Sequence, residues 1–176
     1  PVILTPRQTQ LREERPLLRW TPVAGATGYR VRLTGTDWET TVADTELRYP
    51  ADAPALQRGV TYRLVVEASG RSSNEEGSAG AGFTLVSAAD AAQVDAEAAR
   101  VRGLGLGALA TDLLLANMLA GRGLHAEAIL LLEASAAGEE AALVRLLGDL
   151  YLATGLSRAA EESYGVALRL AQDRGD

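Results

Sequence analysis

The chain has 176 residues with no cysteine, 17 basic residues that are all arginine, and 23 acidic residues. Residues 88–176 hold 7 arginines against 13 acids, so the formal charge of -6 belongs to the second half; an acidic half beside a neutral half excludes nucleic acid as an expected partner. Without cysteine the chain has no disulfide, thiolate metal site or thiol nucleophile, and its length allows two small domains.

Residues 17–83 carry the pattern of short antiparallel β-strands. Apolar residues recur there with a period of two, and Pro, Gly and Asp or Asn interrupt them at intervals of about ten residues. Strands are predicted near residues 17–21, 28–34, 37–42, 45–50, 60–68 and 82–86, with a seventh within residues 2–12. The alternation also predicts the side chains that face the core. These are Tyr29, Val31, Leu33, Tyr62, Leu64, Val66 and Ala68.

Three segments of this half resemble the fibronectin type III family. They are Leu18-Arg-Trp20 followed by Tyr29-Arg-Val31, the stretch from Leu56 to Tyr62, and Val66-Glu-Ala68. The resemblance covers about residues 10–87 and implies an antiparallel β-sandwich domain over residues 1–87. In that family a tryptophan packs between the two sheets and a tyrosine hydroxyl binds an earlier loop. The resemblance assigns these roles to Trp20 and Tyr62.

The second half is predicted to be helical. Val94, Ala98 and Val101 form one stripe over residues 88–102, which predicts an amphipathic helix. Three glycines at 103, 105 and 107 then end it, so residues 88–107 are assigned to a connecting helix and a Gly-rich break. No strand precedes these glycines, so they do not form a phosphate-binding loop.

Residues 108–176 contain an internal repeat. Leu115-Ala116, Leu119, Gly123-Leu124, Ala128 and Leu132 recur 32 residues later as Leu147-Gly148, Tyr151, Gly155-Leu156, Ala160 and Tyr164. Each unit is predicted to be two helices, at 108–121 with 124–136 and at 139–154 with 156–171, which makes about five helices with the first. The second unit resembles the tetratricopeptide repeat (TPR) closely, and the first resembles it over fewer positions.

The resemblance to TPR proteins implies a concave groove, lined by the first helix of each pair, that holds a peptide or a partner helix. The expected groove residues are Leu113, Asn117, Ala120, Arg145, Asp149 and Leu152. The alternative is that these side chains pack only on neighbouring helices, because independent arrays of this kind usually contain at least three repeats.

A second set of apolar residues is expected to mediate assembly. The sequence stops at Asp176 directly after the last repeat helix, without the polar capping helix that usually covers such an array. Val2, Ile3 and Leu4 could add a strand to a neighbouring copy, although pairing within their own domain is the plainer interpretation. The expected assembly surface is therefore Val2, Ile3, Leu4, Tyr164, Val166, Leu168 and Leu170.

The sequence offers no catalytic, metal or cofactor site. His125 is the only histidine and begins a repeat helix, so a Ser-His-Asp relay or a histidine metal site cannot be assembled. Asp37, Glu39, Asp44 and Glu46 lack the spacing of a calcium loop. The paired acids at 13–14, 75–76, 139–140 and 161–162 lie in expected loops or at helix ends, where solvation explains them.

We therefore expect a non-catalytic interaction protein that self-associates through its TPR-like repeats, as a homo-oligomer or, in the sharper form, as an extracellular filament. The alternative is a monomeric scaffold of the bacterial envelope that binds a different protein in the groove. The start at Pro1 suggests a mature chain after leader removal, hence an extracellular or periplasmic location. No apolar run approaches the length of a membrane span, so no transmembrane segment is expected.

Overall fold

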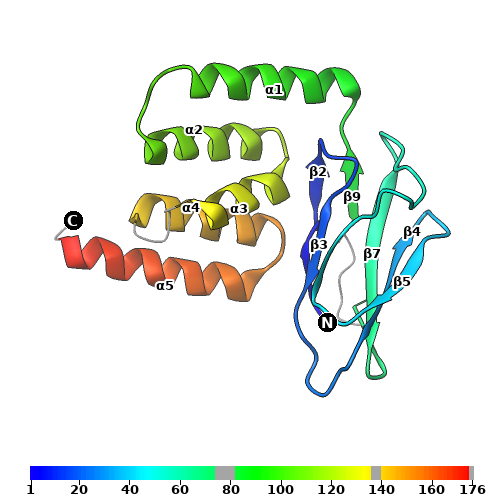
Figure 1. The fold of residues 1–176 in the computed structure, drawn as a ribbon. Helices are drawn as coiled ribbons and strands as arrows, with labels where there is room; N and C mark the ends of the chain where they lie inside the picture. The colour runs from blue at the N-terminus through cyan, green and yellow to red at the C-terminus, as the bar shows by residue number, and fades with distance from the viewer. Residues whose placement is uncertain (74–81, 136–139, 175–176) are drawn as a thin grey trace. The chain divides into compact units, whose positions relative to one another are not determined.

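The computed structural model describes residues 1–73, 82–135 and 140–174. They divide into two compact units, Pro1–Ser87 and Ala88–Asp176, the first made of strands and the second of five helices among the described residues (Figure 1). The chain is thus a β region followed by an α region, as the sequence predicts. The sequence also predicts a turn from Asn74 to Gly82, and all of it except Gly82 lies outside the described residues.

The first unit contains two sheets. A small sheet has the strand order β1-β3-β6, and a larger one has the order β2-β9-β7-β4-β5 with β8 beside β7. The strands are β1 (Ile3–Thr5), β2 (Thr9–Leu11), β3 (Leu17–Trp20), β4 (Tyr29–Thr34), β5 (Glu39–Val42), β6 (Glu46–Arg48), β7 (Thr61–Ala68), β8 (Arg71–Ser72) and β9 (Gly82–Leu85).

The expectation of a wholly antiparallel unit is wrong at one edge. Strand β2 pairs with β9 in parallel, with Thr9 beside Phe83 and Leu11 beside Leu85. The chain leaves the small sheet after β1 and crosses to the large one, where it enters alongside β9 in the same direction. The seventh strand expected within residues 2–12 is therefore two short strands, one in each sheet.

The prediction of which side chains of β4 and β7 face the core is confirmed. The three inward side chains of β4 and the four of β7 are each at most 6% exposed, while Arg30 on the other face of β4 is exposed. Trp20 of the small sheet is 1% exposed, and its ring centroid lies 5.7 Å from that of Tyr29 in the large sheet. Trp20 therefore packs between the two sheets, as expected.

Tyr62 connects the start of β7 to the preceding loop. Its hydroxyl oxygen accepts a hydrogen bond from the backbone N–H of Gln57 at 2.7 Å, and its ring centroid lies 5.8 Å from that of Phe83. The residue is 3% exposed, so this bond satisfies a polar group that would otherwise be buried without a partner.

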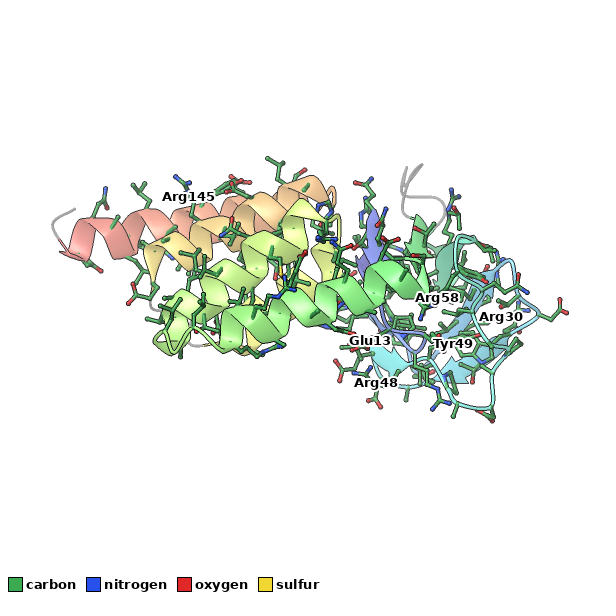
Figure 2. The ribbon with its side chains drawn as sticks, turned by 90° about the horizontal axis from the view of Figure 1, so that it is seen from above. Glu13, Arg30, Arg48, Tyr49, Arg58 and Arg145 are labelled. Atoms are coloured by element: carbon green, nitrogen blue, oxygen red, sulfur yellow. The ribbon has the colours of Figure 1, made fainter. Side chains whose placement is uncertain are left out.

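Two arginines hold the charged segment before β3. Arg48 Nη1 lies 3.1 Å from Glu13 Oε2 and donates to the carbonyl of Arg15, while Arg58 Nη2 lies 2.9 Å from Glu14 Oε1 (Figure 2). Arg58 also donates to the carbonyl of Val86 at 2.7 Å. Solvation alone therefore does not explain the acid pair Glu13–Glu14, because Glu13 pairs with Arg48 at the end of β6 and Glu14 pairs with Arg58 in the loop before β7.

The second unit contains α1 (Ala88–Arg102), α2 (Ala108–Gly121), α3 (His125–Ala134), α4 (Ala141–Ala153) and α5 (Ser157–Arg174). Helix α1 belongs to this unit, where Val94 and Ala98 are buried and Glu97 forms an ion pair with Arg122 at the end of α2. The sequence predicts a connecting helix here, whereas α1 is part of the helical unit.

The two helical hairpins end their first helices in the same way. Gly123 and Gly155 adopt φ of 71° and 76°, in the left-handed region that glycine tolerates best. The N–H of the following leucine bonds to a carbonyl five residues back, from Leu124 to Leu119 at 2.9 Å and from Leu156 to Tyr151 at 2.8 Å. This is the Schellman arrangement. The 32-residue repeat of the sequence is therefore also a repeat of backbone geometry.

Candidate functional site

A groove of about 710 Å³ runs along the helical unit between three helices. Helix α2 contributes Leu113 and Asn117, α4 contributes Ala141, Ala142, Arg145, Leu146 and Asp149, and α5 contributes Tyr164, Ala167, Leu168 and Ala171. Its lining is largely aliphatic with a few polar groups, which suits an apolar helix face or peptide better than a highly charged ligand.

Four of the six predicted groove residues line this groove. They are Leu113 and Asn117 on α2 with Arg145 and Asp149 on α4. Ala120 is partly buried and Leu152 is 55% exposed, and both lie outside the lining. By helical spacing these two share a face with the other predicted residues of their helices, but they are not part of the groove lining.

Two residues predicted for assembly belong to the same groove. Tyr164 and Leu168 line its α5 wall, and Leu168 is 60% exposed. Val166 instead lines a smaller groove of about 450 Å³ between α3, α4 and α5, and Leu170 is partly buried. The expected assembly surface of α5 is thus divided between two sides of the helix.

The N-terminal assembly residues are held within the first unit. Ile3 is 3% exposed and pairs with Trp20 in the small sheet. The N–H of Val2 donates to the side-chain hydroxyl oxygen of Thr21, and the Val2 carbonyl accepts from the backbone N–H of Thr21, both at 2.9 Å. Leu4 is partly buried, and Val2 is 36% exposed. Strand β1 pairs with β3 and is an edge strand of the small sheet, so these residues are part of the first unit's own fold, and no contact with a second copy is needed to explain them.

Two lining residues of the groove, on α4 and α5, are joined by a hydrogen bond. The hydroxyl of Tyr164 donates to Asp149 Oδ1 at 2.8 Å, and this bond raises the pKa of Tyr164 above its ordinary value because it stabilises the protonated hydroxyl. Burial and the charge of Asp149 act in the same direction, while the charge of Arg145 acts against them.

Arg145 is the positive charge of the groove. It is exposed on the surface of the helical unit (Figure 2), and no hydrogen bond or ion pair to it is present within the described part of the chain. Asn117 is less available as a donor, because its side-chain amide already donates to the carbonyl of Leu113 at 2.8 Å. Arg145 is therefore the groove group best able to bind a carboxylate from outside.

Sequence reasoning missed five lining residues. Four of them are alanines on α4 and α5, whose small side chains leave the space that forms the groove. Leu146 lies one residue after Arg145 and also lines the groove. The repeat pattern does not indicate it, because that pattern marks positions that pack between helices. The resemblance also pointed to the first helix of each pair, whereas α5 is a second helix.

The first unit has a polar surface hollow of about 520 Å³ on the large sheet, lined by residues of β4, β5, β7 and β8. Arg30 pairs there with Glu39 at 2.8 Å and approaches Glu67 at 3.8 Å, and the hydrogen bond from Arg30 lowers the pKa of Glu39. These charges neutralise one another within the unit, so the hollow offers no concentrated charge for a ligand.

Within residues 1–73, 82–135 and 140–174, no group of three or more histidine, aspartate or glutamate side chains is arranged to hold a metal ion. Over the same residues, none of the helices has the length and apolarity needed to cross a bilayer. A scan against protein-family models gave no match to this chain, and a search of curated proteins gave no match either.

Proposed function

We propose that this chain is a non-catalytic interaction protein that self-associates through the groove between α2, α4 and α5. The observation that carries the proposal is the largely aliphatic groove with Leu168, which is 60% exposed, on its α5 wall. Among the described residues, every exposed leucine lies in the helical unit. They are Leu104, Leu106, Leu109, Leu114, Leu152 and Leu168, between 38% and 62% exposed. Of these six, Leu168 lines the groove, and an exposed apolar side chain on an aliphatic groove is typical of a protein interface.

We infer that the two units are fibronectin type III-like and TPR-like. Trp20 between the sheets and the Tyr62 hydroxyl on the preceding loop support the first assignment. The two equivalent hairpins, with buried small residues Ala116, Ala128, Gly148 and Ala160 at repeat positions, support the second. Both kinds of domain serve mainly as binding platforms, which agrees with a function in interaction rather than catalysis.

A second candidate is the binding of a different polypeptide in the groove of a monomeric scaffold. Arg145 favours it, because an exposed cation beside an aliphatic lining suits an amphipathic helix that carries a carboxylate. This candidate requires the pure chain to stay monomeric. The mass of the pure protein therefore separates the two functions.

The test compares the parent chain with one disrupting variant and one control by light scattering over a wide concentration range. Leu168→Glu places a charge on the groove wall and should reduce association. Leu114→Glu changes a leucine of α2 that is 42% exposed and does not line the groove, because it lies about 100° around the helix from Leu113.

Association that survives Leu114→Glu but not Leu168→Glu supports the proposal. Equal association of all three proteins would place the contact elsewhere on the chain, and a monomeric parent would overturn self-association. Both leucines are exposed, so neither substitution removes a core contact, and far-ultraviolet circular dichroism should confirm that both variants remain folded.

A further inference from the structure

Four exposed residues surround the bond between Asp149 and Tyr164 and form a small surface that we call the α4–α5 face. They are Arg145 and Leu152 on α4 with Glu161 and Leu168 on α5. Each of them lies one turn from a member of the bond in sequence, at four residues for Arg145 and Leu168 and at three for Leu152. Glu161 is likewise three residues from Tyr164, so all four lie on the same side of the helix pair.

The positions of these residues follow from the antiparallel packing of the two helices. A short turn at residues 154–156 joins α4 to α5, and Asp149 lies opposite Tyr164. Moving back one turn on α4 and forward one turn on α5 places Arg145 level with Leu168, about 6 Å along the axis from the bond. Moving forward one turn on α4 and back one turn on α5 places Leu152 level with Glu161.

The face therefore has two different diagonals. One diagonal joins the two leucines, Leu152 and Leu168, which are 55% and 60% exposed. The other joins opposite charges, Arg145 and Glu161. Neither charged residue has a hydrogen-bond or ion-pair partner among the residues that the structure describes.

This arrangement is self-complementary under a two-fold rotation about an axis that follows the leucine diagonal. Such a rotation sets Leu168 against Leu168 of a second copy and Leu152 against Leu152. It also sets Arg145 of each copy against Glu161 of the other, so that both charges gain a partner. An interface in which residue i contacts j and j contacts i is the defining property of an isologous contact.

We propose that the α4–α5 face is the two-fold interface of a homodimer, with reciprocal Arg145–Glu161 ion pairs on either side of a leucine contact. The proposal rests on the proposed self-association and specifies it. An isologous contact closes after two copies, so it predicts a dimer of defined mass instead of the open filament that a head-to-tail contact would produce.

The experiment is a charge exchange followed by sedimentation velocity on the full chain. Arg145→Glu and Glu161→Arg each create two like-charge pairs in a two-fold dimer, so each should raise the dissociation constant at least about tenfold. The double variant restores both pairs with their signs exchanged and should dimerise like the parent. Arg169→Glu, an exposed arginine of α5 outside the face, changes the net charge as much as Arg145→Glu does and should have no effect.

The outcomes separate the inference from the function on which it rests. A parent that dimerises while both single variants also dimerise overturns the inference and leaves self-association standing. A double variant that stays monomeric, or a parent whose mass grows without limit with concentration, overturns the two-fold contact. A parent that is monomeric at every concentration overturns the proposed function as well and favours the binding of a different polypeptide.

Discussion

A Cβ atom added to Gly148 would lie 2.7 Å from Cε1 of Tyr164 and 2.8 Å from Cδ1. Real side chains essentially never approach this closely, so the tyrosine ring occupies the space that any larger residue at 148 would need. The hydroxyl on this ring donates the hydrogen bond to Asp149. The small residue of the second repeat therefore sets the position of a tyrosine that lines the groove.

Gly148→Ala should displace the Tyr164 ring and destabilise the helical unit, and Gly148→Leu should cost more, about 1–3 kcal/mol or above. Urea denaturation followed at the helical signal measures this loss. Gly121→Ala is the matched control, because nothing lies within 4 Å of a Cβ at that position near the end of α2. It should be neutral or slightly stabilising, since alanine favours a helix more than glycine does. Equal stability of the parent and Gly148→Leu would contradict the repeat alignment.

The raised pKa of Tyr164 predicts a loss of stability at alkaline pH. A group whose pKa is raised by folding contributes stability that is fully present below the ordinary tyrosine value of about 10 and is lost as the pH rises through the higher folded value. The hydrogen bond to Asp149 is the largest cause of the shift. The ultraviolet titration curve of Tyr164→Phe, subtracted from that of the parent, should leave the signal of one phenol that ionises above about pH 10. In Asp149→Asn the same phenol should ionise at lower pH, and an unchanged titration would show that the bond does not form in solution.

Trp20→Ala should destabilise the first unit by about 3–5 kcal/mol, because it removes a large side chain that is 1% exposed. Trp20→Phe should cost less, since Trp20 Nε1 is buried without a hydrogen-bond partner in the described parts of the chain. In a Trp38→Phe background the remaining fluorescence should be that of a shielded indole. Emission typical of an indole in water would contradict the packing between the sheets.

Tyr62→Phe should cost about 1–2 kcal/mol, because the N–H of Gln57 loses its acceptor while the ring keeps its contact with Phe83. Chemical denaturation of the first unit measures the difference. Tyr151→Phe provides the comparison, since its hydroxyl bonds to Glu133 at an exposed site in the second unit, where water replaces the lost partner. If Tyr62→Phe lost no more free energy of unfolding than Tyr151→Phe, the result would contradict a structural role for the Tyr62 hydroxyl.

Much of the fold could be predicted because the local signals are strong. The alternation at Tyr29, Val31 and Leu33 leaves only one face of β4 for the core. The glycines at 123 and 155 end equivalent helices, so the ends of α2 and α4 follow from the 32-residue repeat. These features depend on neighbours within a few residues, which a sequence states directly.

The rest depends on contacts that are distant along the chain. Strand β2 joins β9 across more than seventy residues, and nothing near Thr9 indicates which edge it will choose. The groove shows the same limit, because helical spacing placed Leu152 and Asp149 on one face but could not say where the wall of α5 ends. Glu161 appeared only as one of a pair of acids, and its relation to Arg145 requires the antiparallel register of α4 and α5.

Sedimentation equilibrium of the unmodified full chain is the most direct test of self-association. The account predicts an average mass that rises with concentration from 18.5 kDa and levels off at twice that value. A mass of 18.5 kDa at every concentration would contradict it.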